Sequence, residues 1–210
     1  MTKTLWNRFD KRWLTGLPRV VFEGRIFVVQ TEAEANRAVR HLLAEPLLGF
    51  DTETRPTFRP GPMHPVALLQ VATPDTCFLF RLCRIGLPDA LVRLLSDTEV
   101  TKVALSWKDD TGQLQRLRRF RMGSFVELQQ YVRDFGIEDA SLQKIYGNVF
   151  GQKISKSQQL TNWEADALTE GQKRYAATDA WACMRLYEEL RRLKESGQWE
   201  LKEYEETVSE

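Results

Sequence analysis

The segment LLGFDTET (47–54) limits what this chain can fold into more than any other part of the sequence. An apolar run from Leu47 to Phe50 is typical of a buried central strand, and it leads directly into Asp51 and Glu53. On a strand, that spacing puts both carboxylates on one face. Two adjacent carboxylates raise each other's pKa, and charge beside a buried strand is unfavourable unless it is compensated. A hard divalent cation with oxygen ligands provides that compensation, so the segment predicts a metal site.

Length and composition indicate a globular protein. The chain has 210 residues, enough for one domain with a sizeable core, and its net charge of +1 produces no overall field that indicates nucleic acid or a membrane. No apolar stretch approaches the ~20 residues of a membrane span, and the N-terminus lacks the apolar core of a secretory signal. Cys77, Cys83 and Cys183 lack metal-ligand spacing. We therefore expect reduced thiols in a cytoplasmic protein that does not bind membranes.

The sequence divides into three expected regions. Residues 1–22 form an N-terminal extension with an excess of basic side chains, and residues 23–195 form the single domain. Residues 196–210 form an acidic tail, and we expect both ends of the chain to be solvated. The sequence leaves the oligomeric state open.

Hydrophobic patterning predicts strands that alternate with helices. The expected strands are 25–30, 47–52, 66–73, 76–82 and 100–106. Expected helices follow Thr31, an N-cap with Glu34 at the capping-box position, and cover 88–95 and 109–119. After Phe125 helical segments dominate, the longest at 170–195. This order predicts an α/β fold: a mixed sheet flanked by helices, with a helical C-terminal half.

Two further groups of acidic residues come later in the chain. Asp109 and Asp110 follow the strand VTKVALS, and the C-terminal ends of strands are where α/β folds place ligand sites. Helix capping, which contributes ~0.5–1 kcal/mol, is the alternative role for one of them. Tyr175 and Asp179 are four residues apart and share a helix face. Taken alone, that pair indicates no more than a packed tyrosine beside a surface acid.

Taken together, the motifs resemble the DEDD 3′–5′ exonucleases, which have the ribonuclease H-like fold. The resemblance covers residues 24–192 and is greatest to the branch of ribonuclease D and the Werner-syndrome exonuclease. The motifs occur in the family's order: GFDTETRP, VALLQVAT, CFLFRL, KVALSWKDDTGQL and TNWEADALTEGQKRYAATDAWA. The Werner-type enzymes are the more similar, through FVELQQ, TNW and LTEGQKRYAATDA.

The resemblance assigns catalytic and metal-binding residues. Asp51 and Glu53 match the first motif, and Asp179 matches the last acid. Asp110 aligns better than Asp109 with the remaining acid, because the motif's leucine lies four residues further on. A sister branch has a histidine five residues before the last acid, where this chain has an arginine, so Tyr175 places it in the tyrosine branch.

These assignments imply a two-metal mechanism with Mg²⁺ or Mn²⁺. One ion, held by Asp51, Glu53 and Asp179, would acidify the attacking water. The other, held by Asp51 and through a water by Asp110, would stabilise the leaving 3′ oxygen. Tyr175 would orient the water, because an unperturbed tyrosine with a pKa near ~10 is a poor general base.

Candidate substrate contacts lie outside the acidic motifs. Arg116 belongs to QRLRRFR, which either grips phosphates or forms a solvated helix face. Lys156, in the polar loop KISKS, aligns with a family lysine. Arg55, Phe58 and Arg59 follow the acidic strand; the phenylalanine either stacks on the terminal base or is buried in a rigid Pro-rich loop.

The resemblance implies a 3′–5′ exonuclease that releases nucleoside monophosphates from DNA, with a DNA-repair role. A ribonuclease D-like enzyme that trims RNA is the alternative, although no helical nucleic-acid-binding domain follows residue 195 here. A catalytically silent nucleic-acid-binding domain is the second alternative, but the four acids and the tyrosine are all present. A dinucleotide-dependent oxidoreductase is disfavoured, because no Gly-x-Gly-x-x-Gly follows an early strand.

Overall fold

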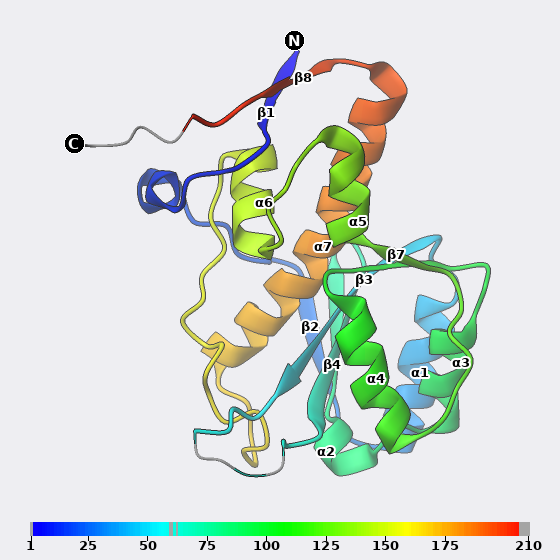
Figure 1. Cartoon of the computed structure of the whole chain (residues 1–210). Coiled ribbons are helices and arrows are strands. Elements are labelled where there is room, and N and C mark those ends of the chain that lie inside the picture. The colour runs from blue at the N-terminus through cyan, green and yellow to red at the C-terminus, as the bar shows by residue number, and fades with distance from the viewer. Residues whose placement is uncertain (1, 59–60, 62, 206–210) are drawn as a thin grey trace.

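A six-stranded mixed sheet forms the centre of the computed structural model, which describes residues 2–58, 61 and 63–205 (Figure 1). Strands β3 and β4 pair antiparallel, as do β4 and β5, and the other neighbouring pairs are parallel. In sheet order the strands are β2 (Arg25–Val29), β5 (Thr76–Phe80), β4 (Val66–Ala72), β3 (Leu47–Thr54), β6 (Thr101–Ala104) and β7 (Phe125–Glu127).

Helices cover both faces of this sheet. On one face lie α1 (Glu32–Leu42), α3 (Asp89–Ser96) and α4 (Trp107–Leu117), and on the other lies α7 (Glu170–Ser196). The remaining helices are α2 (Leu82–Ile85), α5 (Leu128–Tyr131), α6 (Leu142–Phe150) and the 3₁₀ helices η1 (Lys11–Gly16) and η2 (Val132–Phe135). The predicted α/β class, a mixed sheet flanked by helices with a helical C-terminal half, is confirmed.

Strand β4 shows how the sheet separates two cores. All of its residues are buried, so its side chains alternate between the helical layers. Leu69 and Val71 join the core under α1, α3 and α4, whereas Leu68 and Ala72 join the core under α7. The residue between the last two, Gln70, is polar and lies on the α7 face.

Local signals place the helix ends. Helix α1 has the predicted capping box, in which Thr31 accepts from the backbone of Glu34 and the glutamate accepts from the backbone of Thr31. Helix α4 begins at Trp107, two residues earlier than predicted, and the preceding strand is correspondingly shorter. The reason is Ser106, which adopts a left-handed conformation with a φ of 61° and so ends the extended backbone.

The expectation that both ends of the chain are solvated is correct only in part: most described tail side chains are exposed, whereas Leu5, Phe9 and Leu14 of the extension are buried. Strand β1 (Lys3–Trp6) pairs in parallel with β8 (Trp199–Lys202), so the extension and the tail form a second, two-stranded sheet (Figure 1). Leu5 is fully buried, and the Tyr204 hydroxyl donates to Asp10 at 2.5 Å. Apolar burial of the extension thus outweighs the cost of ordering it.

None of the helices in residues 2–58, 61 and 63–205 combines the length and the apolar character needed to cross a bilayer.

Candidate active site

Three carboxylates converge where α7 passes over β3. Asp51 and Glu53 project from one face of the strand, and Asp179 projects toward them from the helix. One carboxylate oxygen from each lies within 4.8 Å of the others. Gly49 makes this approach possible, because a Cβ atom at that position would overlap the carbonyl oxygen of Ala180. The glycine lets α7 lie directly on the strand.

The electrostatics of this cluster call for a cation. Burial raises the pKa of Asp51 well above its usual range, and the charges of Asp179 and Asp110 raise it further. Burial and the neighbouring carboxylates raise the pKa of Glu53 to about 10. Burial raises the pKa of Asp179 to about 7, although Tyr175 and Lys156 oppose the shift. Three oxygen donors this close and this poorly solvated match the ligand preference of a divalent ion.

Asp110 lies near the cluster of Asp51, Glu53 and Asp179 but is not one of the three acids that converge. It stands on the first turn of α4, and its Oδ1 accepts from the Thr52 hydroxyl at 2.8 Å. Burial raises its pKa to about 6. Asp109, the neighbouring acid, is exposed. The geometry therefore favours Asp110 over Asp109 as the fourth acid, as the motif resemblance does, because only Asp110 bonds to a residue of β3.

Tyr175 lies one helical turn before Asp179. Its ring is half-buried, 6.0 Å from the buried ring of Trp163. Burial, together with the charges of Asp179 and Glu53, raises the pKa of the hydroxyl. In the metal-free site the group therefore stays protonated at neutral pH and can donate a hydrogen bond.

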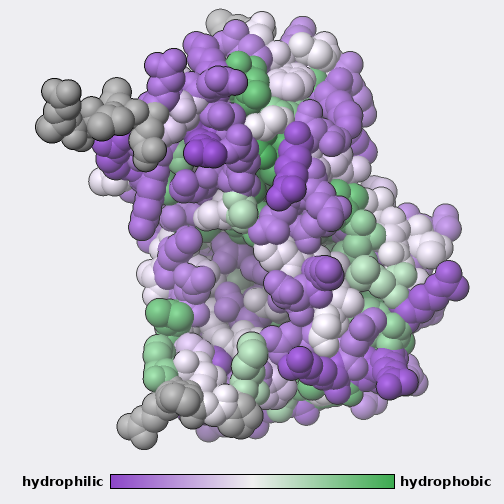
Figure 2. Space-filling model, in the orientation of Figure 1, coloured by the Kyte–Doolittle hydropathy of each residue, from purple (hydrophilic) through white to green (hydrophobic). Residues whose placement is uncertain are grey.

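The acids line a cavity of about 330 Å³. Lys156 stands exposed at its rim, and its charge lowers the pKa of Asp179. Figure 2 shows a hollow rimmed largely by hydrophilic residues on the face where α7 passes over the sheet. Other lining residues include Ser141, Gln143, Ser155, Gln159 and Tyr175. The cavity thus combines an acidic floor with a basic group at its mouth, an arrangement suited to a phosphodiester.

The other predicted substrate contacts occupy varied surroundings. Arg55 forms an ion pair with Glu164 at 3.2 Å. The Phe58 side chain is 76% exposed, so the alternative of a buried phenylalanine is wrong. The neighbouring Arg59 lies outside the described residues. Arg116 is exposed near the C-terminal end of α4, ~9 Å along the helix from Asp110.

Two residues near the acids, Glu127 and Gln70, were not predicted from the sequence as part of the site. Glu127, at the end of β7, accepts from the backbone of Ser106 at 2.9 Å and of Trp107 at 2.7 Å, which fixes the start of α4. Gln70 is fully buried directly across the ladder from Asp51, and its amide has no hydrogen-bond partner among the described residues. A glutamine within the apolar run VALLQVA was the available signal for the second.

The fold is a mixed sheet flanked by helices, and it carries an acidic cluster that could hold a divalent ion. A family model described as 3′–5′ exonuclease matches residues 26–195, and the chain belongs to this family. It is an exonuclease-domain enzyme.

Comparison with known proteins gives the same class. The chain is 32% identical over 158 residues to the mouse bifunctional 3′–5′ exonuclease/ATP-dependent helicase WRN, an alignment that covers 72% of this chain and 11% of that protein. The Aedes aegypti Nibbler EXO domain superposes with a TM-score of 0.74 at 22% identity, covering 85% of this chain and 92% of that domain. Escherichia coli RNase D superposes with a TM-score of 0.73 at 21% identity, covering 82% and 46%. At these identities the two structures share the fold.

Proposed function

We propose that this protein hydrolyses DNA from the 3′ end and releases nucleoside monophosphates, using two divalent ions, Mg²⁺ or Mn²⁺. The observation that carries the proposal is the approach of Asp51, Glu53 and Asp179 within 4.8 Å, in a cavity that also holds Tyr175. Three carboxylates this close together and this poorly solvated repel one another without bound cations.

Each side chain has a defined task in this proposal. Bound divalent ions would lower the pKa of an attacking water and neutralise charge on the phosphate. Asp51, Glu53 and Asp179 hold the ions, and Asp110, fixed by the Thr52 hydroxyl, contributes through a water. The protonated Tyr175 hydroxyl orients the nucleophile.

Two features support contact with the substrate chain. Lys156 places positive charge at the mouth of the cavity, where it would meet the phosphate backbone. The exposed ring of Phe58, which lies beyond the acidic strand with Arg55, offers a stacking surface for a terminal base. Arg116 lies further along α4 and would meet phosphates more remote from the scissile bond.

DNA is our preferred substrate because the chain is also 27% identical, over 164 residues, to a protein of Aquifex aeolicus named DNA polymerase I. RNA is the second candidate, favoured by the fold shared with RNase D, which is described as an exoribonuclease. The test is the ratio of initial rates on DNA and RNA oligonucleotides of one sequence. A higher rate on DNA supports the first assignment, and a higher rate on RNA replaces it with the second. Asp51→Asn is the control for contaminating nucleases and should digest neither.

A further inference from the structure

Strand β2 has a free edge. It lies at the end of the sheet and, among the described residues, pairs only with β5. The Arg25 backbone donates to Asp75 at 2.9 Å, and the Val29 carbonyl accepts from Arg81 at 3.0 Å. In a parallel ladder, alternate residues bond to the same neighbour. The N–H and C=O groups of Ile26 and Val28 therefore point away from the sheet.

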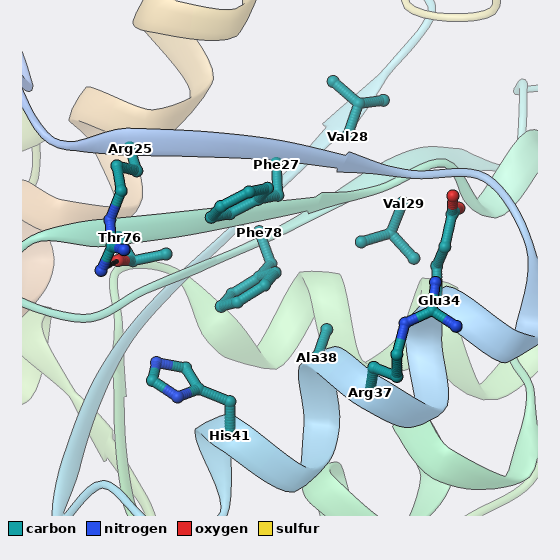
Figure 3. Close-up of a pocket in the computed structure, with 10 residues that line it drawn as sticks. All are labelled: Arg25, Phe27, Val28, Val29, Glu34, Arg37, Ala38, His41, Thr76 and Phe78. Carbon is teal, nitrogen blue, oxygen red and sulfur yellow. Dashed lines mark hydrogen bonds between the residues drawn. The ribbon is translucent and has the colours of Figure 1, made fainter.

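An aromatic surface lies beside that edge. The Phe27 side chain is 47% exposed and stacks on Phe78, with ring centroids 5.5 Å apart and an interplanar angle of 22°. Between β2 and α1 lies a cavity of about 410 Å³, and Figure 3 shows the two rings with Arg37 and His41 on the helix below them. An exposed aromatic ring beside unpaired strand groups is the combination that an added strand covers.

The cavity is on the opposite side of the sheet from the acids. Asp51, Gln70, Leu79 and Val28 are successive register partners across four strands, and this row faces α7. Phe27 belongs to the adjacent row, which faces α1. The surface is therefore distinct from the candidate active site.

The charges around the cavity are balanced. The Arg25 guanidinium lies 3.4 Å from the Asp75 carboxylate. Hydrogen bonds from the Gln30 and Thr31 backbones, together with the charge of Arg37, hold the pKa of Glu34 below its usual value. A polyphosphate chain requires an excess of positive charge, so these pairs disfavour nucleic acid as the occupant. Glu34 and Arg37 carry opposite charges on α1, so this helix face can instead complement the same face of α1 in a second copy.

We propose that β2 is a dimer interface, on which β2 of a second copy pairs antiparallel about a two-fold axis at Phe27. In this register Ile26 of each copy exchanges backbone hydrogen bonds with Val28 of the other. Each Phe27 then faces its counterpart in a non-hydrogen-bonded pair, with Cα atoms ~4.5 Å apart, which favours aromatic contact. The strand is self-complementary because its outward-pointing groups are symmetric about this residue, as a two-fold interface requires.

The interface has a direct consequence for the two candidate active sites. A two-fold axis normal to the sheet joins the two six-stranded halves and keeps both α7 faces on one side. Both acidic clusters would then open on the same face of the dimer.

The first test is the molar mass in solution, measured by sedimentation over a wide concentration range for the wild type, Val28→Pro and Phe27→Glu. Proline at position 28 removes an N–H that points outward and leaves the β5 ladder intact. Glutamate at position 27 places like charges at the axis. We expect a dimeric wild type and monomeric variants, with dimers retained in Leu160→Glu, a control at another exposed apolar residue. A monomeric wild type, or dimers in both variants, would overturn the proposal.

The second test keeps the interface falsifiable if those variants fail to fold. Phe27→Cys in a Cys83→Ser background, which removes the exposed native thiol, should form a disulfide-linked dimer on oxidation. Antiparallel partners in a non-hydrogen-bonded pair lie within the Cα separation that a disulfide spans. Absence of the cross-link contradicts the proposed register. Weaker binding of a labelled oligonucleotide by monomeric Phe27→Glu than by a monomeric wild type would replace the dimer with a nucleic-acid contact.

Discussion

Gly49 of β3 lies directly beneath the Ala180 carbonyl of α7, and this contact sets the distance between the strand that carries Asp51 and the helix that carries Asp179. Gly49, two residues before Asp51, and Ala180, directly after Asp179, thus form one close contact between strand and helix. They allow backbones from distant parts of the chain to meet closely enough for their carboxylates to form one cluster.

Gly49→Ala should therefore damage both stability and activity. The added methyl overlaps a backbone oxygen, which cannot rotate away, so α7 must shift. We expect a loss of about 1–3 kcal/mol in the free energy of unfolding, together with a lower exonuclease rate, measured by urea denaturation and oligonucleotide digestion. Gly112→Ala is the matched control: apart from its chain neighbours and the adjacent backbone of α4, no atom of the described residues lies within 4 Å of its new Cβ. The control should gain stability, by up to about 1 kcal/mol. Equal stability of Gly49→Ala and the wild type would contradict this packing.

Divalent ions should stabilise the protein by binding to the three-acid cluster. Thermal unfolding should shift upward with Mg²⁺ or Mn²⁺, because an ion that binds only the folded state stabilises it by mass action. Asp51→Asn should raise the melting temperature in EDTA, since it relieves repulsion, and should lose most of the metal-dependent increase. Asp109→Asn, which alters an exposed neighbour, should retain that increase. A metal response that persists in Asp51→Asn would place the ion elsewhere.

Asp179 contributes to the pH dependence of the stability of the metal-free protein, together with Asp51 and Glu53. Its folded-state pKa is raised from 3.8 to about 7, so the folded state binds its proton more tightly than the unfolded state. The stabilising effect is complete below the unfolded pKa and is lost as pH rises through the folded pKa. In EDTA, Asp179→Asn should become progressively more stable than the wild type between pH 4 and 7. A stability difference independent of pH would show that the carboxyl is not perturbed.

Two buried glutamines should respond oppositely to replacement by leucine. Gln70 lacks a hydrogen-bond partner among the described residues, so Gln70→Leu removes an unsatisfied group and should stabilise the fold by ~1 kcal/mol. The Gln172 side chain forms hydrogen bonds with Thr169, Thr161 and Asn162, so Gln172→Leu should destabilise the fold. Chemical denaturation compares the two. Destabilisation by Gln70→Leu would show that a buried water or ion satisfies the amide.

The local parts of this structure were predictable from sequence. The apolar run before Asp51 predicted the central strand, and the capping box at Thr31 predicted the start of α1. The four-residue spacing of Tyr175 and Asp179 placed both on one helix face. In each case the determining contacts lie within a few residues of one another.

Contacts between distant segments were not predictable from local pattern. Lys3 pairs with Trp199 across nearly the whole chain, and charge alone suggested that both ends were solvated. Glu127 stabilises the start of α4 from a neighbouring strand. The pairing order that leaves the edge of β2 free depends on the complete sheet.

In the proposed mechanism, Asp51, Glu53 and Asp179 hold the ions for hydrolysis from a 3′ end. The most direct measurement is digestion of a 5′-labelled single-stranded DNA oligonucleotide with Mn²⁺, comparing the wild type with Asp179→Asn. We expect a ladder of products shortened one nucleotide at a time from the 3′ end, abolished by EDTA and by the substitution. Undiminished digestion by Asp179→Asn, or by the wild type in EDTA, would contradict it.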